Sequence, residues 1–225
     1  MTVTVNVLHF PGTNCQDETM RAFAQVGAAP RLRYIADLMA GDERLDDADI
    51  LCIPGGFSFG DHLRGGLIAA LALRTQLSTQ FRSCRARPMI GICNGFQIAV
   101  HAGCFGTDVA LRTNRQGTFF DEPSAEHVVE DVAGDVWLAG LDGQSLTFPL
   151  AHGEGRFECP DPAGGEHWRP ALRYAKGAEV DGSAGAIAGI TSTDGLTFGL
   201  MNHPERATDP AVRLAFFENG VRAAR

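Results

Sequence analysis

Short apolar runs alternate with helical stretches through the first two-thirds of the chain, and this alternation most constrains the fold. Several runs stop at Pro or Gly, as strands commonly do, and several helical stretches end just before Gly. A β-α-β order with short connections requires parallel strands joined by crossover helices. The pattern predicts strands at 3–10, 31–35, 50–53 and 88–92, helices at 17–26, 62–83 and 94–102, and a surface helix and loop at 37–49.

The last third of the chain has a different pattern. Residues 186–191 and 197–201 flank a Thr-Asp-Gly turn at 193–195, and Asp-Gly suits the positive φ angles of a hairpin. A final helix is expected at 210–222, whereas residues 104–170 give no clear pattern. We therefore expect one α/β domain over 1–225. Its mainly parallel central sheet has helices on both faces, and a C-terminal β-hairpin follows.

Charge and hydropathy exclude two classes of partner. The 225 residues include 19 basic and 27 acidic side chains, a net charge of 19 − 27 = −8. This balance argues against nucleic acid or an anionic membrane as a partner, since Lys and Arg must neutralise phosphates there. The longest apolar run, 67–73, is too short to span a bilayer. Because the first basic residue is Arg21, the charged start of a secretory signal is missing, and we expect a cytoplasmic chain.

Six cysteines are irregularly spaced, without a C-x-x-C pair. A disulfide framework is not expected in such a chain, and one reactive thiol among buried neutral ones fits better. Gly91-Ile-Cys-Asn-Gly95 stands where an apolar strand meets a helix, which is the nucleophile-elbow pattern with Cys93 as nucleophile. The helix N-terminus favours a thiolate there, and the Asn94 N–H could donate to an oxyanion. The alternative is a buried structural cysteine.

A nucleophilic cysteine needs a base and a group that orients the base. His203-Pro-Glu205 follows the second hairpin strand, and Pro204 should keep the backbone extended at His203. In extended backbone, side chains two apart point the same way, so His203 and Glu205 form the candidate pair. An ordinary surface loop with a chance His and Glu is the alternative.

A glycine-rich segment, Pro54-Gly-Gly-Phe-Ser-Phe-Gly-Asp61, follows the third predicted strand. Its N–H groups could complete an oxyanion hole or cradle an anion, although a tight turn alone would also need glycine. A Walker-type loop requires Lys before Ser or Thr, and the one lysine, Lys176, precedes Gly177. No G-x-G-x-x-G follows a strand. ATP chemistry and dinucleotide binding are therefore not expected in this chain.

Two further segments contain candidate residues. The first ends the first predicted strand, and the second is a predicted loop. Cys15, in Pro11-Gly-Thr-Asn-Cys15, is a rival nucleophile that lacks the glycine two residues later. Ala151-His-Gly-Glu-Gly-Arg-Phe157 interleaves charges with glycines, which suggests contact with a ligand or partner. Its His and Glu lack a recognisable metal-ligand spacing, so no metal site is assigned.

Six blocks occur in one order from residue 11 to residue 206: the segments 11–15, 54–61, 91–97 and 151–157, Leu63-Arg64, and His203-Pro-Glu-Arg206. This set closely resembles the glutamine amidotransferase subunits of phosphoribosylformylglycinamidine synthase, of the class I (triad) amidotransferase family. Gln16, Asn202 and Gly65-Gly66 depart mildly from the family pattern. Residues 112–125 match it only loosely.

The resemblance implies Cys93 as nucleophile, His203 as general base and acid, and Glu205 as its orienter. It also implies an oxyanion hole formed by the Gly56 and Asn94 N–H groups.

By the same resemblance, Gln97 lines the glutamine pocket, and the chain releases ammonia from glutamine without a cofactor of its own. The ammonia goes to a large synthetase subunit that uses ATP and Mg to convert formylglycinamide ribonucleotide to the amidine in purine synthesis. A small accessory subunit joins the complex. The alternatives are an amidotransferase for another acceptor, a Cys-elbow hydrolase, and an inactive interaction subunit.

Overall fold

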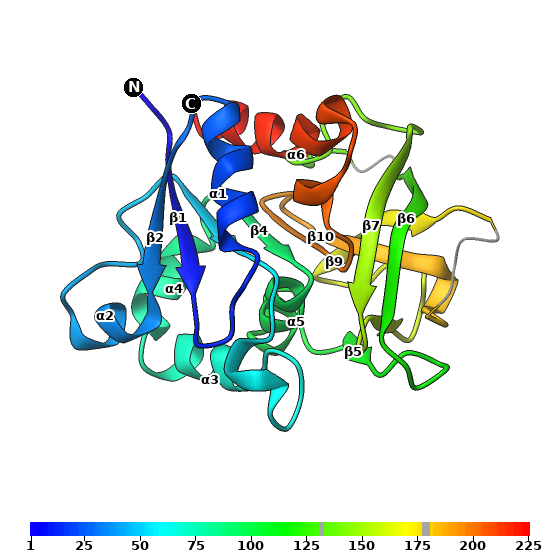
Figure 1. Cartoon of the computed structure of the whole chain (residues 1–225), viewed down its shortest axis with the longest axis horizontal. Coiled ribbons are helices and arrows are strands. Elements are labelled where there is room, and N and C mark those ends of the chain that lie inside the picture. The colour runs from blue at the N-terminus through cyan, green and yellow to red at the C-terminus, as the bar shows by residue number, and fades with distance from the viewer. Residues whose placement is uncertain (131–132, 177–180) are drawn as a thin grey trace.

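A computed structural model describes residues 1–130, 133–176 and 181–225. In this part of the chain a nine-stranded sheet runs through the molecule (Figure 1). In spatial order its strands are β2 (Ala29–Tyr34), β1 (Thr4–His9), β3 (Ile50–Ile53), β4 (Met89–Ile92), β11 (Thr197–Leu200), β10 (Ile187–Ser192), β9 (Trp168–Tyr174), β6 (Phe120–Val129) and β7 (Ser145–His152).

The half of the sheet from β2 to β11 is parallel, as the β-α-β alternation predicts. Every residue of β3 and β4 is buried, which explains their unbroken apolar sequences, because parallel strands are covered on both faces. Their carboxyl ends meet at one edge of the sheet. The loops that follow β1, β3, β4 and β11 are the segments in which the sequence analysis finds its candidate residues.

Helices cover both faces of the parallel half, so the predicted α/β class is confirmed. In Figure 1, α1 (Gln16–Gln25) and α6 (Pro210–Ala223) lie above β4, and α3 (Leu67–Thr75), α4 (Ser78–Cys84) and α5 (Asn94–His101) lie below it. Edge-to-face aromatic pairs fill each layer, with ring centroids 4.9 Å apart for Phe23 and Phe217 and 5.8 Å apart for Phe96 and Phe105. The short helix α2 (Ile35–Ala40) packs beside β2.

The half of the sheet beyond β11 is antiparallel. The predicted hairpin is confirmed as β10 and β11, with Gly195 at φ +72° in its turn. The remaining strands of this half, β6, β7 and β9, arise from or just beyond the segment whose sequence gives no clear pattern. A separate two-stranded sheet pairs β5 (Ala110–Arg112) with β8 (Arg156–Glu158). The sheet is therefore mixed, parallel in one half and antiparallel in the other.

The single helix predicted at 62–83 is wrong in detail. The chain forms α3 and α4, separated at Gln76 and Leu77, and residues 62–66 precede the first of them. Gly66 has φ +77°, and a Cβ there would lie 2.8 Å from the Ile98 nitrogen. A residue in the left-handed conformation is not part of an α-helix, and Gly66 is held in it by close contact with α5. The helix α3 therefore begins after Gly66, at Leu67.

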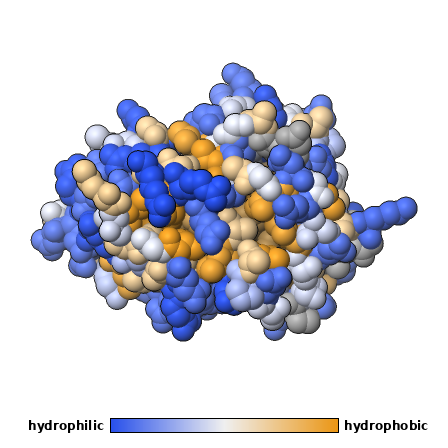
Figure 2. Space-filling model, turned by 90° about the horizontal axis from the view of Figure 1, so that it is seen from above, coloured by the Kyte–Doolittle hydropathy of each residue, from blue (hydrophilic) through white to orange (hydrophobic). Residues whose placement is uncertain are grey.

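The face seen from above in Figure 2 shows hydrophobic residues at its centre, bordered by hydrophilic ones. Partly buried apolar side chains that pack on the core include Val212 and Leu214 of α6. Among the described residues, none of the helices combines the length and the apolar character needed to cross a bilayer.

Candidate active site

Cys93 occupies a strained turn between β4 and α5. Its φ of 52° and ψ of −110° are rare for a residue with a Cβ, and such strain is characteristic of nucleophile elbows. The flanking glycines are sterically required. A Cβ at Gly95 would lie 1.8 Å from the Ile53 carbonyl oxygen, and one at Gly91 would lie 2.6 Å from the Gly95 oxygen. The turn therefore packs directly against β3 and fixes the thiol at the sheet edge.

His203 and Glu205 form a buried pair beside this thiol. The His203 Nδ1 and Glu205 Oε1 atoms are 2.6 Å apart, and the two residues are 2% and 3% exposed. Burial alone would lower the pKa of His203. The charges of Glu205 and Cys93 outweigh burial and raise that pKa well above its usual value. Since Glu205 bonds Nδ1, Nε2 remains for the thiol.

The predicted extended backbone through Glu205 is wrong. Pro204–Arg206 forms a turn of 3₁₀ helix after His203, whose ψ is 84°. Pro at the first position of this turn needs no N–H partner and has the required φ. The turn brings the Glu205 carboxylate back onto the imidazole, so the pairing arises from a tight turn and not from strand alternation.

The glycine-rich segment after β3 lies against the loop after β1. Gly56 has φ +143°, and a Cβ there would lie 2.7 Å from the Asn14 nitrogen. The Phe57 N–H donates to the Gly12 carbonyl at 3.0 Å. From the elbow side, the Asn94 Oδ1 accepts from the Ser58 N–H at 3.1 Å. The segment that contains Gly56 is thus hydrogen-bonded to Asn94, the residue that follows Cys93.

A cavity of about 270 Å³ opens in front of Cys93. Gln97 lines it and is fixed by two hydrogen bonds. Its Oε1 accepts from the Asn94 Nδ2 at 2.8 Å, and its Nε2 donates to the Glu154 carbonyl at 2.9 Å. The predicted pocket residue therefore lies beside the nucleophile. The walls come from the loops after β3, β5 and β7.

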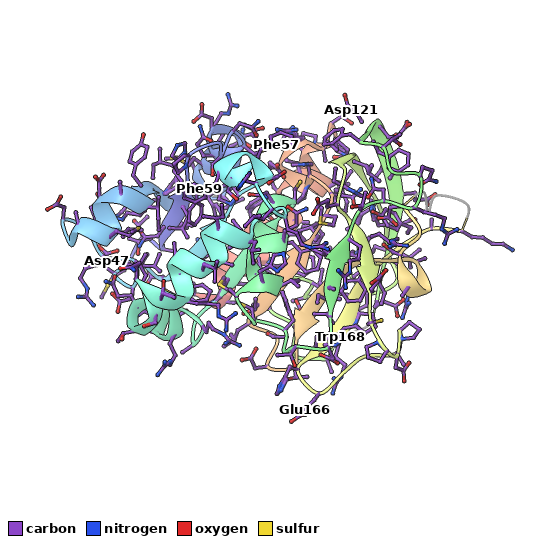
Figure 3. The ribbon with its side chains drawn as sticks, turned by 90° about the horizontal axis from the view of Figure 1, so that it is seen from below. Asp47, Phe57, Phe59, Asp121, Glu166 and Trp168 are labelled. Atoms are coloured by element: carbon purple, nitrogen blue, oxygen red, sulfur yellow. The ribbon has the colours of Figure 1, made fainter. Side chains whose placement is uncertain are left out.

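A second cavity, of about 210 Å³, borders the same thiol on the side of His203. Asn14, Cys15 and Arg206 line it, together with Phe57 and Asp121. Figure 3 shows Phe57 and Asp121 at the same end of the molecule, away from Asp47 and Glu166. Both cavities share Gly56, Phe57, Cys93, Phe119 and Ala151, so the nucleophile is reached from two sides.

Cys15, the rival nucleophile, lies close to the same imidazole. Potential ligand atoms of Cys15, His203 and Glu205 fall within 4.8 Å of one another, a set that could hold a metal ion. All three groups already have partners, because Glu205 bonds His203 and the Arg206 Nη2 donates to the Cys15 sulfur at 3.0 Å. Burial raises the pKa of the Cys15 thiol, which disfavours a thiolate there.

Asp61 gives the larger cavity an acidic wall together with Glu154. Burial and the charge of Glu154 raise the pKa of Asp61 to about 6, against the hydrogen bond that Asn94 donates. Since the folded-state pKa lies above the unfolded one, this carboxyl makes folding less favourable as pH rises from about 4 to about 6.

Asp61→Asn is therefore expected to be more stable than the parent chain at pH 7.5, by about 1 kcal/mol because the group is partly exposed. The difference should vanish near pH 4. Urea unfolding of both chains across this range measures it. A difference that does not change with pH would contradict the assignment.

Sequence reasoning did not find Asn114 or the aromatic pair at the mouth of the cavity. The Phe57 and Phe119 ring centroids are 6.1 Å apart, and the two side chains are 44% and 51% exposed. Asn114 is buried and bonds to the His152 carbonyl. Both Phe119 and Asn114 lie in the segment that matches the family pattern only loosely, and no local periodicity marks them.

Comparison with known proteins identifies the family. Residues 2–216 match the CobB/CobQ-like glutamine amidotransferase domain. The chain is 39% identical over 214 residues to phosphoribosylformylglycinamidine synthase subunit PurQ of Parasynechococcus marenigrum, covering 93% of each chain. It is 39% identical over 215 residues to the PurQ subunit of Corynebacterium efficiens, covering 93% of this chain and 90% of that one.

A solved structure agrees with these relatives. A chain in the structure of PurLQS from Thermotoga maritima superposes with a TM-score of 0.81 at 30% identity, over 100% of this chain and 98% of that one. These matches agree with the elbow cysteine and the buried His–Glu pair, and together they identify the family of the chain. The chain belongs to the CobB/CobQ-like glutamine amidotransferases, in the group of PurQ subunits of phosphoribosylformylglycinamidine synthase.

Proposed function

We propose that residues 1–225 form one amidotransferase domain that hydrolyses glutamine for phosphoribosylformylglycinamidine synthase. The observation that carries the proposal is the convergence of Cys93 with the buried His203–Glu205 pair beside a cavity of about 270 Å³. A nucleophile, a base and an orienting carboxylate are the parts that covalent amide hydrolysis requires. The chain supplies all three from the carboxyl ends of two neighbouring parallel strands, β4 and β11.

In the proposed first half-reaction, the Cys93 thiol passes its proton to His203, and the sulfur attacks the side-chain amide carbon of glutamine. The Gly56 and Asn94 N–H groups stabilise the oxyanion, and each such donor contributes about 10²–10³ in rate. The carbon–nitrogen bond then breaks, and His203 returns its proton to the departing nitrogen, so ammonia leaves.

In the second half-reaction, His203 accepts a proton from water, which attacks the γ-glutamyl thioester. The carbon–sulfur bond breaks, the proton returns to the sulfur, and glutamate leaves. Glu205 keeps the imidazole in one tautomer and stabilises its charged form throughout. Gln97 lines the pocket that holds the substrate.

The released ammonia serves a partner. The matching chain from Thermotoga maritima belongs to a structure of PurLQS, which supports an assembly of this chain with other subunits. We place the ATP- and Mg-dependent step, conversion of formylglycinamide ribonucleotide to formylglycinamidine ribonucleotide, on a large synthetase subunit. A small accessory subunit completes the complex. A molecule with a charged phosphate does not cross a bilayer, so the acceptor and the enzyme share one compartment. We place both in the cytoplasm.

Reconstitution tests this function. The chain is mixed with the synthetase and accessory subunits of its own organism, and amidine formation is measured with glutamine or with ammonium as nitrogen source. We expect glutamine-dependent synthesis only when this chain is present, and ammonium-dependent synthesis without it. If the chain instead supports amidation of another acceptor, or no glutamine use at all, the proposed function is wrong.

A further inference from the structure

Asn114 lies behind the larger cavity and bonds to both segments that form its walls. The residue is 2% exposed. Its Nδ2 donates to the Thr118 carbonyl at 3.1 Å and to the His152 carbonyl at 2.8 Å. Its Oδ1 accepts from the Gly155 N–H at 3.1 Å and lies 3.1 Å from the His152 Nδ1. A primary amide has two hydrogens and two lone pairs, so this side chain is fully used.

The two walls come from segments far apart in the sequence. Residues 113 and 117–119 form one wall, and residues 151–154 form the other. The backbone joins them near the same point, because the Asn114 N–H donates to the Gly153 carbonyl at 2.9 Å. Asn114 is not itself among the lining residues. It therefore acts on the cavity through the residues that it holds.

Asn114 contacts His152 at two points, the backbone carbonyl and the imidazole ring. It is buried and lines the cavity. Burial and, to a smaller extent, the charge of His203 lower the pKa of His152 to about 3, so the ring is neutral. The Asn114 Oδ1 can only accept, so Nδ1 carries the ring proton. A Cβ at Gly155 would lie 2.2 Å from this ring, so the chain turns closely around it.

We propose that Asn114 is a positioning residue that sets the shape of the glutamine pocket by holding these two walls together. This inference rests on the proposed function, and it assigns Asn114 to substrate affinity and not to the chemistry at Cys93. A preformed pocket binds its ligand without first ordering its loops. Loss of the four contacts should therefore raise KM for glutamine more than it lowers kcat.

The test compares Asn114→Ala, Asn114→Asp and Asn219→Ala in the reconstituted complex. Asn219 is the matched control, since it is buried and its Nδ2 donates to the Trp137 and Ala139 carbonyls at 3.0 Å, on α6 and away from both cavities. Asn114→Asp keeps the acceptor and loses both donations. It also carries the test if the alanine variant fails to fold.

We expect Asn114→Ala to raise KM for glutamine roughly 10- to 100-fold while kcat changes less than about threefold. Asn114→Asp should raise KM by at least about threefold. Ammonium-dependent synthesis should be unchanged in both, and Asn219→Ala should keep the parent KM. The inference is overturned if KM stays within about twofold of the parent in the Asn114 variants, or rises equally in Asn219→Ala.

Hydrogen–deuterium exchange separates failure of this inference from failure of the proposed function, because it needs no activity. Peptides covering 113–119 and 151–155 should both exchange faster in an Asn114 variant and not in Asn219→Ala. Unchanged exchange in both segments would overturn the inference. An absence of glutamine hydrolysis by the parent complex would instead overturn the proposed function.

Discussion

Cys93→Ala is expected to abolish glutamine-dependent amidine synthesis, with a loss of at least about 10⁴-fold, while synthesis from ammonium stays at the parent rate. The Cys93 thiol forms the covalent intermediate, and the neighbouring Cys15 thiol is disfavoured as a substitute because burial raises its pKa. Removal of one side-chain atom at the elbow leaves the backbone donors and the cavity in place. The measurement is the rate of amidine formation by the reconstituted complex with each nitrogen source.

Cys15→Ala is the matched control for this experiment. Cys15 lies beside the same imidazole and lines the smaller cavity, so a general effect of removing a thiol near His203 would appear in both variants. We expect Cys15→Ala to keep glutamine-dependent synthesis within about tenfold of the parent. The opposite pattern, with Cys15 required and Cys93 dispensable, would reverse the assignment of the nucleophile.

Glu205→Gln should lower kcat/KM for glutamine by about 10³–10⁴-fold. The parent carboxylate accepts from the His203 Nδ1–H at 2.6 Å in a buried site. A glutamine amide can present a donor to Nδ1, which favours the wrong tautomer, and it cannot stabilise the imidazolium. The pKa of His203 should also fall, because the charge of Glu205 helps to raise it. Rates measured against pH report both effects.

Glu18→Gln provides the same substitution at a neighbouring carboxylate. Glu18 accepts from the Arg206 Nε at 2.9 Å and belongs to α1, so it shares the neighbourhood of Glu205 without being its partner on His203. We expect kcat/KM within about threefold of the parent for this control. Equal losses in both variants would show a general electrostatic effect and contradict an orienting role for Glu205.

The parallel half of the fold could be predicted because its signals are local. A run such as Ile50–Ile53 is apolar throughout, stops at Pro54, and is followed by glycines, and each of these features is visible within eight residues. The antiparallel half depends on pairing between distant segments. The register of β6 and β7 joins Phe120 to His152, and a bulge interrupts it, so no short window carries the pattern.

In the candidate site too, residues in local motifs could be predicted, and a residue whose contacts come from distant segments could not. The elbow at Cys93 is one short turn. Its glycines are explained by close contacts that the strand-to-helix pattern already implies, of Gly91 with the backbone at Gly95 and of Gly95 with β3. The His203–Glu205 pair was expected for a different reason from the one that the structure gives, since a 3₁₀ turn replaces extended backbone. Asn114 could not be predicted, because its partners His152 and Gly155 lie 38 and 41 residues away.

Peptide mapping by mass spectrometry tests the central claim most directly. The reconstituted complex is mixed with glutamine, stopped in acid during turnover, and digested, so that thioesters survive for analysis. The account requires a γ-glutamyl group on the peptide that contains Cys93 and none on the peptide that contains Cys15. A complex that hydrolyses glutamine with the adduct on Cys15, or with an unmodified Cys93 under conditions that trap thioesters, would contradict it.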